Sequence, residues 1–229
     1  MTSSLRDRRR RRTRSALLSA GRTLLAARDI GGISVDEIVA AADVAKGSFY
    51  NHFPDKDGFA RAIGAAVRRE VERAVAAANQ QVTDPAHALA RGLCVFVRYA
   101  IEQPDSAQVL WRLNPGATMA DAPINRALRE DVARGIRTRR FSDIDVETGV
   151  LLVIGAVVVA MRHVLEERVT TPARRIAERM SAAMLRACGL TSAAAGDVAA
   201  NACMLVFAPG MADDEVSARR ARLGRSGNG

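Results

Sequence analysis

The chain has 229 residues, nearly half of them apolar, and a formal net charge of +9. This length suffices for one or two domains with a substantial core, and the positive charge favours a polyanionic partner. Cys94, Cys188 and Cys203 are isolated and odd in number, which argues against a zinc site or a disulfide framework and indicates small apolar thiols in a reducing cytoplasm.

A membrane location is not expected from the apolar pattern. The basic N-terminus is not followed by an apolar segment, so we expect no secretory signal. The longest strongly apolar stretch, Gly149–Met161, has 13 residues, whereas spanning a bilayer takes ~20. We therefore interpret this stretch as part of a buried helix.

Helical periodicity runs through most of the chain, and no segment favours a strand. Residues 1–12, which include five consecutive arginines at Arg8–Arg12, are predicted to be a disordered basic arm. A first helix is predicted over residues 13–28, and Gly31 and Gly32 end that segment.

Two short helices joined by a tight turn are predicted next. Ser34 opens the first of them, and Glu37 completes a capping box three residues later. Asp43 lies in the turn, where a left-handed backbone is favoured and Asp tolerates it better than most residues. The second short helix is predicted over residues 45–52, with its aromatic side chains turned inward.

The segment Ser34–Phe59 holds four of the nine aromatic residues and both lysines of the chain. Asp55 caps a long helix, predicted over residues 56–80, with an apolar residue at every fourth position. Six further helices are predicted over residues 85–102, 105–113, 121–138, 145–167, 172–188 and 191–206. The whole is an all-α protein of about nine to ten helices.

Residues 13–59 resemble the DNA-binding domain of the TetR family of transcriptional repressors. Ser34-Val-Asp-Glu-Ile-Val-Ala and Val44-Ala-Lys-Gly-Ser-Phe-Tyr-Asn-His-Phe-Pro-Asp-Lys carry the resemblance, and the Tyr-x-His-Phe-x-x-Lys run is its most specific part. The resemblance implies a three-helix, helix-turn-helix DNA-binding domain over residues 13–56. It implies a helical ligand-binding and dimerisation domain over 57–208. Residues 209–229 lose apolar periodicity and are predicted to be a disordered tail.

The second helix of such a motif lies in the major groove of DNA, with its N-terminal residues at the base edges. Lys46 can donate to guanine and Ser48 can pair with several bases, while Gly47 permits close backbone approach. The phosphate contacts are expected from residues around this helix: Ser34, Tyr50, His52 and Lys56.

Each of these residues also has a structural alternative. Tyr50 is alternatively a core aromatic with an exposed tip, and Ser34 is alternatively a helix cap alone. Lys46, Ser48 and His52 are alternatively plain surface residues. The Arg8–Arg12 tract either contacts DNA or is an idle tail.

In the second half, the resemblance implies two late helices, 146–166 and 172–188, that form a homodimer interface. Two recognition helices would then read a palindromic operator. It also implies a mainly apolar pocket for a small-molecule effector, and the candidate lining residues are Phe96, Tyr99, Trp111, Met119 and His163.

The leading hypothesis is therefore a homodimeric, ligand-responsive repressor in the cytoplasm that needs no cofactor. A DNA-binding regulator controlled by a protein partner or by its abundance is the alternative. An enzyme is not expected, because the sequence has no phosphate loop, metal-ligand spacing or nucleophile motif. Binding to anionic vesicles but not to duplex DNA would favour a membrane-surface protein.

Overall fold

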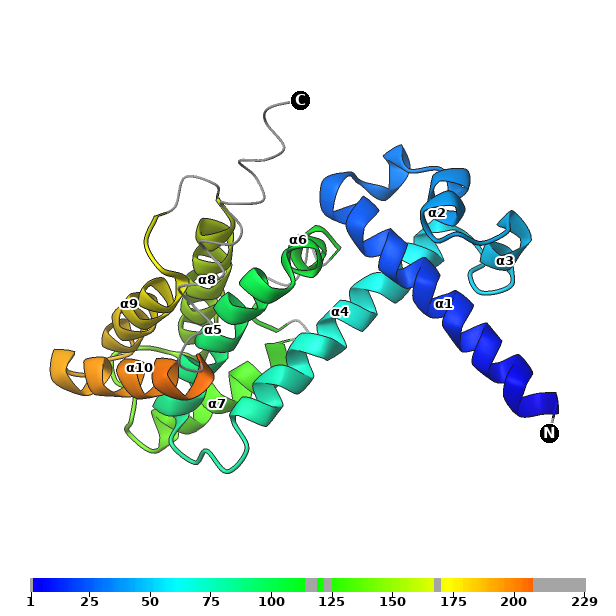
Figure 1. Cartoon of the computed structure of the whole chain (residues 1–229). Helices are drawn as coiled ribbons and strands as arrows, with labels where there is room; N and C mark the ends of the chain where they lie inside the picture. Colours follow the sequence, from blue (N-terminus) through cyan, green and yellow to red (C-terminus); the bar gives the residue numbers. More distant parts are fainter. Residues whose placement is uncertain (1, 114–118, 122–124, 167–169, 208–229) are drawn as a thin grey trace. The chain divides into compact units, whose positions relative to one another are not determined.

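The computed structural model describes residues 2–113, 119–121, 125–166 and 170–207, with side chains from residue 6 onward. Within these ranges the chain forms ten α-helices and one 3₁₀ helix, which confirms the predicted all-α class (Figure 1). The helices are α1 (Thr2–Ala27), η1 (Ile30–Gly32), α2 (Val35–Ala41), α3 (Lys46–Tyr50), α4 (Lys56–Ala78), α5 (Pro85–Glu102), α6 (Pro104–Arg112), α7 (Arg126–Arg137), α8 (Val146–Leu165), α9 (Ala173–Ala187) and α10 (Ser192–Val206).

The helices form two compact units. One contains Met1–Glu70 and Gln103–Pro115, and the other contains Val71–Glu102 and Gly116–Gly229. The division falls within α4, and α6 belongs to the first unit, where it packs against α1. The domain boundaries after residues 56 and 208 stay predictions, and the predicted tail over 209–229 lies outside the described residues.

Helix α1 begins at Thr2, eleven residues before the predicted start at residue 13. The Arg8–Arg12 tract is thus helical, which corrects the prediction of a disordered arm over residues 1–12. Arginine is a good helix former, and lengthening an existing helix is far easier than nucleating a new one. The packed part of α1 therefore supports further helical turns on its N-terminal side.

An aromatic cluster forms the core of the first unit. The rings of Phe49 and Phe59 lie 5.3 Å apart between centroids, and those of Phe53 and Phe59 lie 4.9 Å apart. All three side chains are almost fully buried. Offset and edge-to-face ring contacts add to the stabilisation that comes from burial. This cluster holds the short helix α3 between α2 and α4.

Helix α2 starts and ends as the sequence predicts. The Ser34 hydroxyl accepts a hydrogen bond from the Glu37 backbone N–H at 3.1 Å, and the Glu37 carboxylate accepts one from the Ser34 N–H at 2.7 Å. The turn after α2 contains Asp43 with a φ of 51°, so the expected left-handed residue is confirmed. Local interactions thus set the angle between α2 and α3.

In the second unit, α5 is the central helix and packs against α7, α8, α9 and α10. Helix α8 is 20 residues long, and its length and apolar composition alone would let it cross a membrane. Val150, Val153 and Ala160 of α8 are nevertheless buried, and the helix packs on its neighbours α5, α7 and α9. It therefore has the contacts of a core helix, as the sequence predicts.

Candidate nucleic-acid interface

The first turn of α3 presents an open surface. The Lys46 side chain is exposed, and a Cβ added at Gly47 would meet no atom within 4 Å. Ser48 is half-buried on the same turn. These are the three residues that the sequence predicts at the base edges, and nothing in the described chain covers Gly47.

Lys46 has a partner that sequence analysis did not identify. Its ammonium lies 2.8 Å from a carboxylate oxygen of Asp36 on α2, and both side chains are largely exposed. The hydrogen bond and the charge of Asp36 raise the pKa of Lys46 above its ordinary value. The pair holds the Lys46 side chain beside α2 in the free protein.

Tyr50 and His52 follow at the end of α3. The Tyr50 side chain is 55% exposed, although its ring meets the buried Phe49 ring edge-on at 5.3 Å. His52 is half-buried, and its pKa lies below the ordinary value because of burial and then the positive charges of Arg10 and Arg14. A lowered pKa leaves this imidazole neutral at neutral pH. Tyr50 is thus more than half exposed while its ring packs on the core, so its phosphate contact and the alternative of a core aromatic with an exposed tip both stay predictions.

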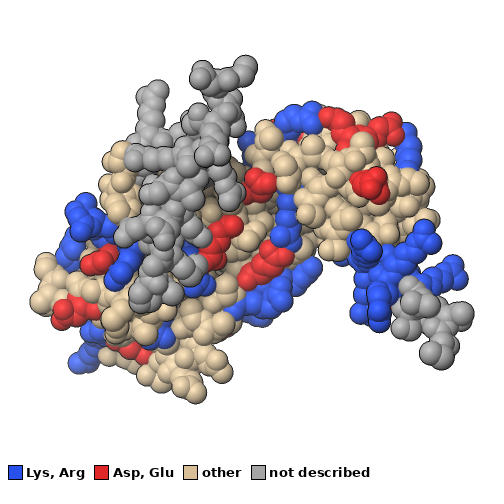
Figure 2. All heavy atoms as spheres, in the orientation of Figure 1, with Lys and Arg blue, Asp and Glu red and all other residues tan. Residues whose placement is uncertain are grey.

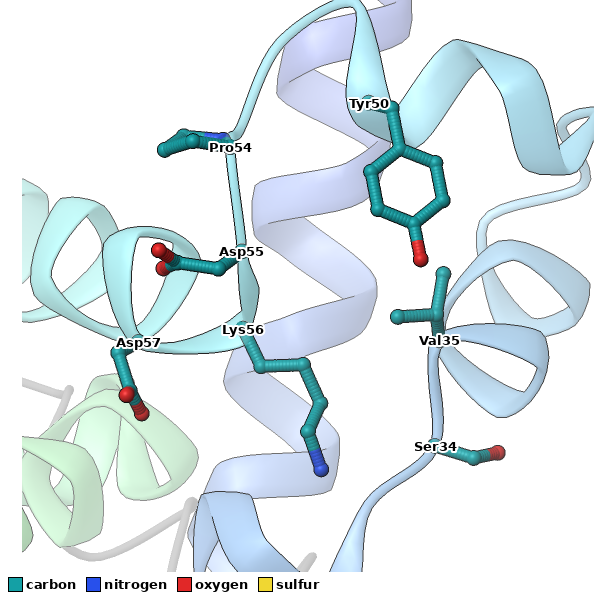
Figure 3. A pocket seen from close by; sticks show the side chains of 7 residues that line it. All are labelled: Ser34, Val35, Tyr50, Pro54, Asp55, Lys56 and Asp57. Atoms are coloured by element: carbon teal, nitrogen blue, oxygen red, sulfur yellow. The ribbon is translucent and has the colours of Figure 1, made fainter.

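A cavity of about 410 Å³ lies between the start of α2 and the start of α4 (Figure 3). Its lining residues are Ser34, Val35, Tyr50, Pro54, Asp55, Lys56 and Asp57. The structure therefore brings three of the four predicted phosphate contacts, Ser34, Tyr50 and Lys56, around one hollow. The Tyr50 hydroxyl points into it beside Val35 (Figure 3).

Lys56 also has a structural role that the sequence did not indicate. Its ammonium donates hydrogen bonds to the backbone carbonyls of Ile30 at 3.2 Å and Ile33 at 2.8 Å. These contacts connect the start of α4 to the segment that leads into α2. If Lys56 contacts a phosphate, its ammonium does so while it is held by these two carbonyls.

Basic side chains of α1 lie close to the end of α3. The guanidinium carbon of Arg14 is 5.4 Å from the centre of the Phe53 ring, within the range of a cation–π contact. Figure 2 shows a dense group of Lys and Arg side chains around the N-terminal end of α1. The sequence contains the five-arginine run, but only the tertiary structure brings Arg10 of that run close to His52.

The five predicted ligand-lining residues do not share one environment. Tyr99 is buried and Phe96 half-buried on α5. Met119 is 61% exposed and His163 on α8 is exposed. Trp111 belongs to α6, which groups with the first unit. Of the five, only Tyr99 and Phe96 are at least partly buried members of the second unit, so the grouping of all five around a ligand stays a prediction.

No metal site is found in the described part of the chain, because no group of three or more His, Cys, Asp or Glu side chains there is placed to hold an ion. The exposed helix start, the basic side chains and the hollow beside Tyr50 fit an extended anion instead.

Two curated repressors are similar to the N-terminal part of the chain. The HTH-type transcriptional repressor DhaR of Mycobacterium sp. (strain GP1) is 32% identical over 72 residues, which are 31% of this chain and 36% of DhaR. The HTH-type transcriptional repressor NemR of Escherichia coli (strain K12) is 36% identical over 72 residues, which are 31% of this chain and 33% of NemR. The match thus spans about a third of each relative.

Solved structures resemble the chain over most of its length. RolR in complex with resorcinol has 25% identity and a TM-score of 0.55, covering 84% of this chain and 95% of RolR. A gamma-butyrolactone receptor (ArpA-like protein) has 21% identity and a TM-score of 0.66, covering 85% of this chain and 98% of the receptor. At this identity the second likeness shows the fold alone.

Two family models match along the chain. The model of bacterial regulatory proteins of the tetR family matches residues 17–63, which include α2, α3 and the turn between them. The tetracyclin repressor-like C-terminal domain matches residues 84–201, more than half of the 229 residues. The chain therefore belongs to the TetR family of bacterial regulatory proteins, with its helix-turn-helix in the first compact unit.

Proposed function

We propose that this protein is a homodimeric transcriptional repressor that binds a palindromic DNA operator and is released from it by a small apolar ligand. The observation that carries the proposal is the first turn of α3, where the exposed Lys46 and the uncovered Gly47 lie beside the half-buried Ser48. A helix with a basic and a small residue at an exposed N-terminal turn can enter the major groove and reach base edges.

Proteins of the TetR family regulate transcription and are not enzymes, so the function to be tested is binding rather than catalysis. Both curated relatives are repressors, which supports repression rather than activation. The cytoplasm is the compartment in which such a protein meets DNA, and we place this one there.

Dimerisation is supported by an exposed apolar face on α8. Leu151, Gly155 and Val159 are spaced by four residues, so they lie on one side of the helix, and all three are exposed in the single chain. Gly155 has open space above it, which permits a second helix to approach closely. We assign this face, together with α9, to a second copy of the chain.

Ligand control is supported by the RolR structure, which holds resorcinol in a protein of the same fold. In this chain, the half-buried Phe96 and the buried Tyr99 on the central helix α5 are the aromatic candidates. A ligand that prefers the conformer with poorly spaced DNA-reading heads lowers operator affinity by its differential affinity, commonly ~1–3 kcal/mol.

Selection of bound duplexes from a random pool tests the proposal, because it reports both the half-site sequence and the half-site spacing. Lys46→Ala should then weaken binding to the selected operator more than binding to random duplex. Equal weakening would assign Lys46 to phosphate contact and refute its base-reading role. A pool that yields no enriched sequence would refute sequence-specific binding.

A screen for small apolar compounds that raise the melting temperature tests the ligand. If the compound is the proposed effector, it should also lower operator affinity, and the operator should lower the affinity for the compound by the same factor, because linkage is reciprocal. Failure of a broad aromatic and lactone panel to shift the melting temperature would favour the alternative, a regulator controlled by a protein partner or by its abundance.

A further inference from the structure

The N-terminal turns of α1 carry a basic face that the proposed helix-turn-helix contacts leave unused. Positions 25, 21 and 17 of α1 are spaced by four residues and are occupied by Leu25, Gly21 and Leu17, all buried against the rest of the first unit. Side chains three or four residues apart share one face of a helix. The inward face of α1 is thus apolar along its packed part.

The same face becomes basic where the packed core ends. Toward the N-terminus it presents Arg14, three residues before Leu17, and then Arg10 and Arg6 at spacings of four residues; all three are exposed. Arg14 lies over the ring of Phe53, at the level of the helix-turn-helix core. Arg10 and Arg6 lie about one and two helical turns further toward the N-terminus of α1. The basic face therefore begins next to the core at Arg14 and continues along α1 toward its N-terminus.

The end of α3 lies on the same side of the unit. The charges of Arg10 and Arg14 act on the imidazole of His52, which follows α3 directly. Within the described side chains, no ion pair joins Arg6, Arg10 or Arg14 to an acidic group. A row of exposed guanidinium groups beside the proposed DNA-reading helix fits an array of phosphates.

We propose that Arg6 and Arg10 form a helical arm that binds phosphates of the duplex next to each half-site, without reading its bases. From Arg14 to Arg6 the helix rises about 12 Å, at about 1.5 Å per residue. At about 3.4 Å per base pair this is a reach of about three to four base pairs. The inference rests on the proposed function, and it extends the protein–DNA contact from the half-site to the flanking base pairs.

The helix offers a matched control on its other side. Arg8 and Arg12 are also exposed, but they lie roughly opposite Leu17 around α1. The double variants R6Q/R10Q and R8Q/R12Q remove the same charge from the same N-terminal turns of α1. Arginine and glutamine have similar helix propensities, so both variants keep α1 helical, which circular dichroism checks.

The experiment measures the affinity of both variants and of the wild type for operator and random duplexes over a range of salt. R6Q/R10Q should make the slope of log K against log salt less steep by about 3.6, because the two arms of a dimer together lose four phosphate contacts at roughly 0.9 each. It should weaken operator and random duplex by a similar factor, because phosphates carry no sequence information. R8Q/R12Q should keep a slope close to that of the wild type.

Operator duplexes shortened by about four base pairs on each flank provide the second measurement. On them the wild type should bind like R6Q/R10Q, since the phosphates that the arm contacts are gone. A persisting difference would place the two arginines elsewhere on the duplex and overturn the inference. The His52 pKa, followed by NMR, should rise in R6Q/R10Q and stay unchanged in R8Q/R12Q, because only the first variant removes the Arg10 charge.

The outcomes separate this inference from the proposed function. Wild-type protein that binds its operator, with equal slopes in the two double variants, overturns the arm alone. Wild-type protein that binds no duplex overturns both. Unchanged duplex slopes together with a loss of binding to phosphatidylserine vesicles in R6Q/R10Q would assign the arm to a lipid surface instead.

Discussion

Gly21 allows α1 to lie directly against α4 in the first compact unit. A Cβ at this position would be 2.4 Å from Cζ of Phe59 and 2.5 Å from Cδ1 of Ile63. Both of those side chains are fully buried, so they have no free space into which to move. Because Gly21 has a hydrogen atom in place of a side chain, Phe59 and Ile63 can pack directly against the α1 backbone.

We expect Gly21→Ala to destabilise the protein by about 1–3 kcal/mol, because adding a methyl group to a packed core forces its neighbours out of place. Urea unfolding followed by circular dichroism measures the change in the free energy of unfolding. Gly92→Ala is the control, since a Cβ there meets no atom within 4 Å. That variant should be about as stable as the wild type or up to about 1 kcal/mol more stable. Equal stability of Gly21→Ala and the wild type would show that α1 and α4 can separate without cost.

At the scale of single elements, α2 depends on its N-terminal cap. The carboxylate of Glu37 accepts a hydrogen bond from the Ser34 N–H and another from the Arg28 side chain at 2.7 Å. The Ser34 backbone bond, followed by the Arg28 and Ser34 side-chain bonds, lowers the pKa of Glu37 from 4.5 to about 2. The cap is therefore strongest when this carboxylate is ionised.

The contribution of Glu37 to the stability of the fold therefore depends on pH. The folded pKa lies below the unfolded one, so Glu37 stabilises the fold fully above pH 4.5 and loses that contribution as pH falls toward 2. We expect Glu37→Gln to be less stable than the wild type above pH 4.5 and to approach it near pH 2. Urea midpoints across this range measure the difference. A difference that stays constant with pH would show that the ionised carboxylate contributes nothing to the cap.

The packing of α10 on α5 brings two thiols together. The Sγ atoms of Cys94 and Cys203 are 3.0 Å apart, and both side chains are fully buried. Burial raises the pKa of Cys188 to about 11, and the contact with Cys94 and burial also raise the pKa of Cys203. Thiolates are the reactive form of cysteine, so Cys188 and Cys203 have little reactivity in the folded chain, and full burial keeps reagents away from Cys94.

We therefore expect a thiol-specific dye to label the native protein slowly and the urea-unfolded protein at once, at all three cysteines. The labelling rates, followed by mass spectrometry, provide the measurement. Rapid labelling of Cys94 or Cys203 at a urea concentration below the unfolding transition would mean that α10 detaches from α5 on its own.

At the scale of the whole molecule, the proposed dimer joins its two DNA-reading heads through the apolar face of α8, where Leu151, Gly155 and Val159 are exposed. We expect Val159→Glu to yield monomers, because a carboxylate in a packed apolar interface is desolvated without a partner. Operator affinity should fall strongly, since a palindrome is read by two linked recognition helices. Analytical ultracentrifugation and operator binding measure the two effects.

Met204→Glu on α10 is the matched control for this prediction. Met204 is 57% exposed and Val159 is 59% exposed, so both substitutions place a charge at an equally accessible apolar position. The control should keep the oligomeric state and operator affinity of the wild type. If it dissociates the protein and Val159→Glu does not, the interface lies on α10 rather than on α8.

Most helices, their caps and the helix-turn-helix could be predicted from the sequence, because those features depend on neighbours a few residues apart. The Ser34–Glu37 box, the left-handed Asp43 and the bounds of α5 are of this kind. The candidate site was predicted less completely. Its residues were identified by type and order, while the partners that restrain them come from other elements.

The sequence by itself thus determined an all-helical chain with a capped α2 and an exposed basic turn at the start of α3. Only the tertiary structure decided that Asp36 holds Lys46, that Lys56 is bound to carbonyls of the 30–33 segment, and that α6 packs with α1. Helical periodicity and capping act within one or two turns of chain. Contacts between residues ten to ninety positions apart depend on how whole helices pack, which no local pattern specifies.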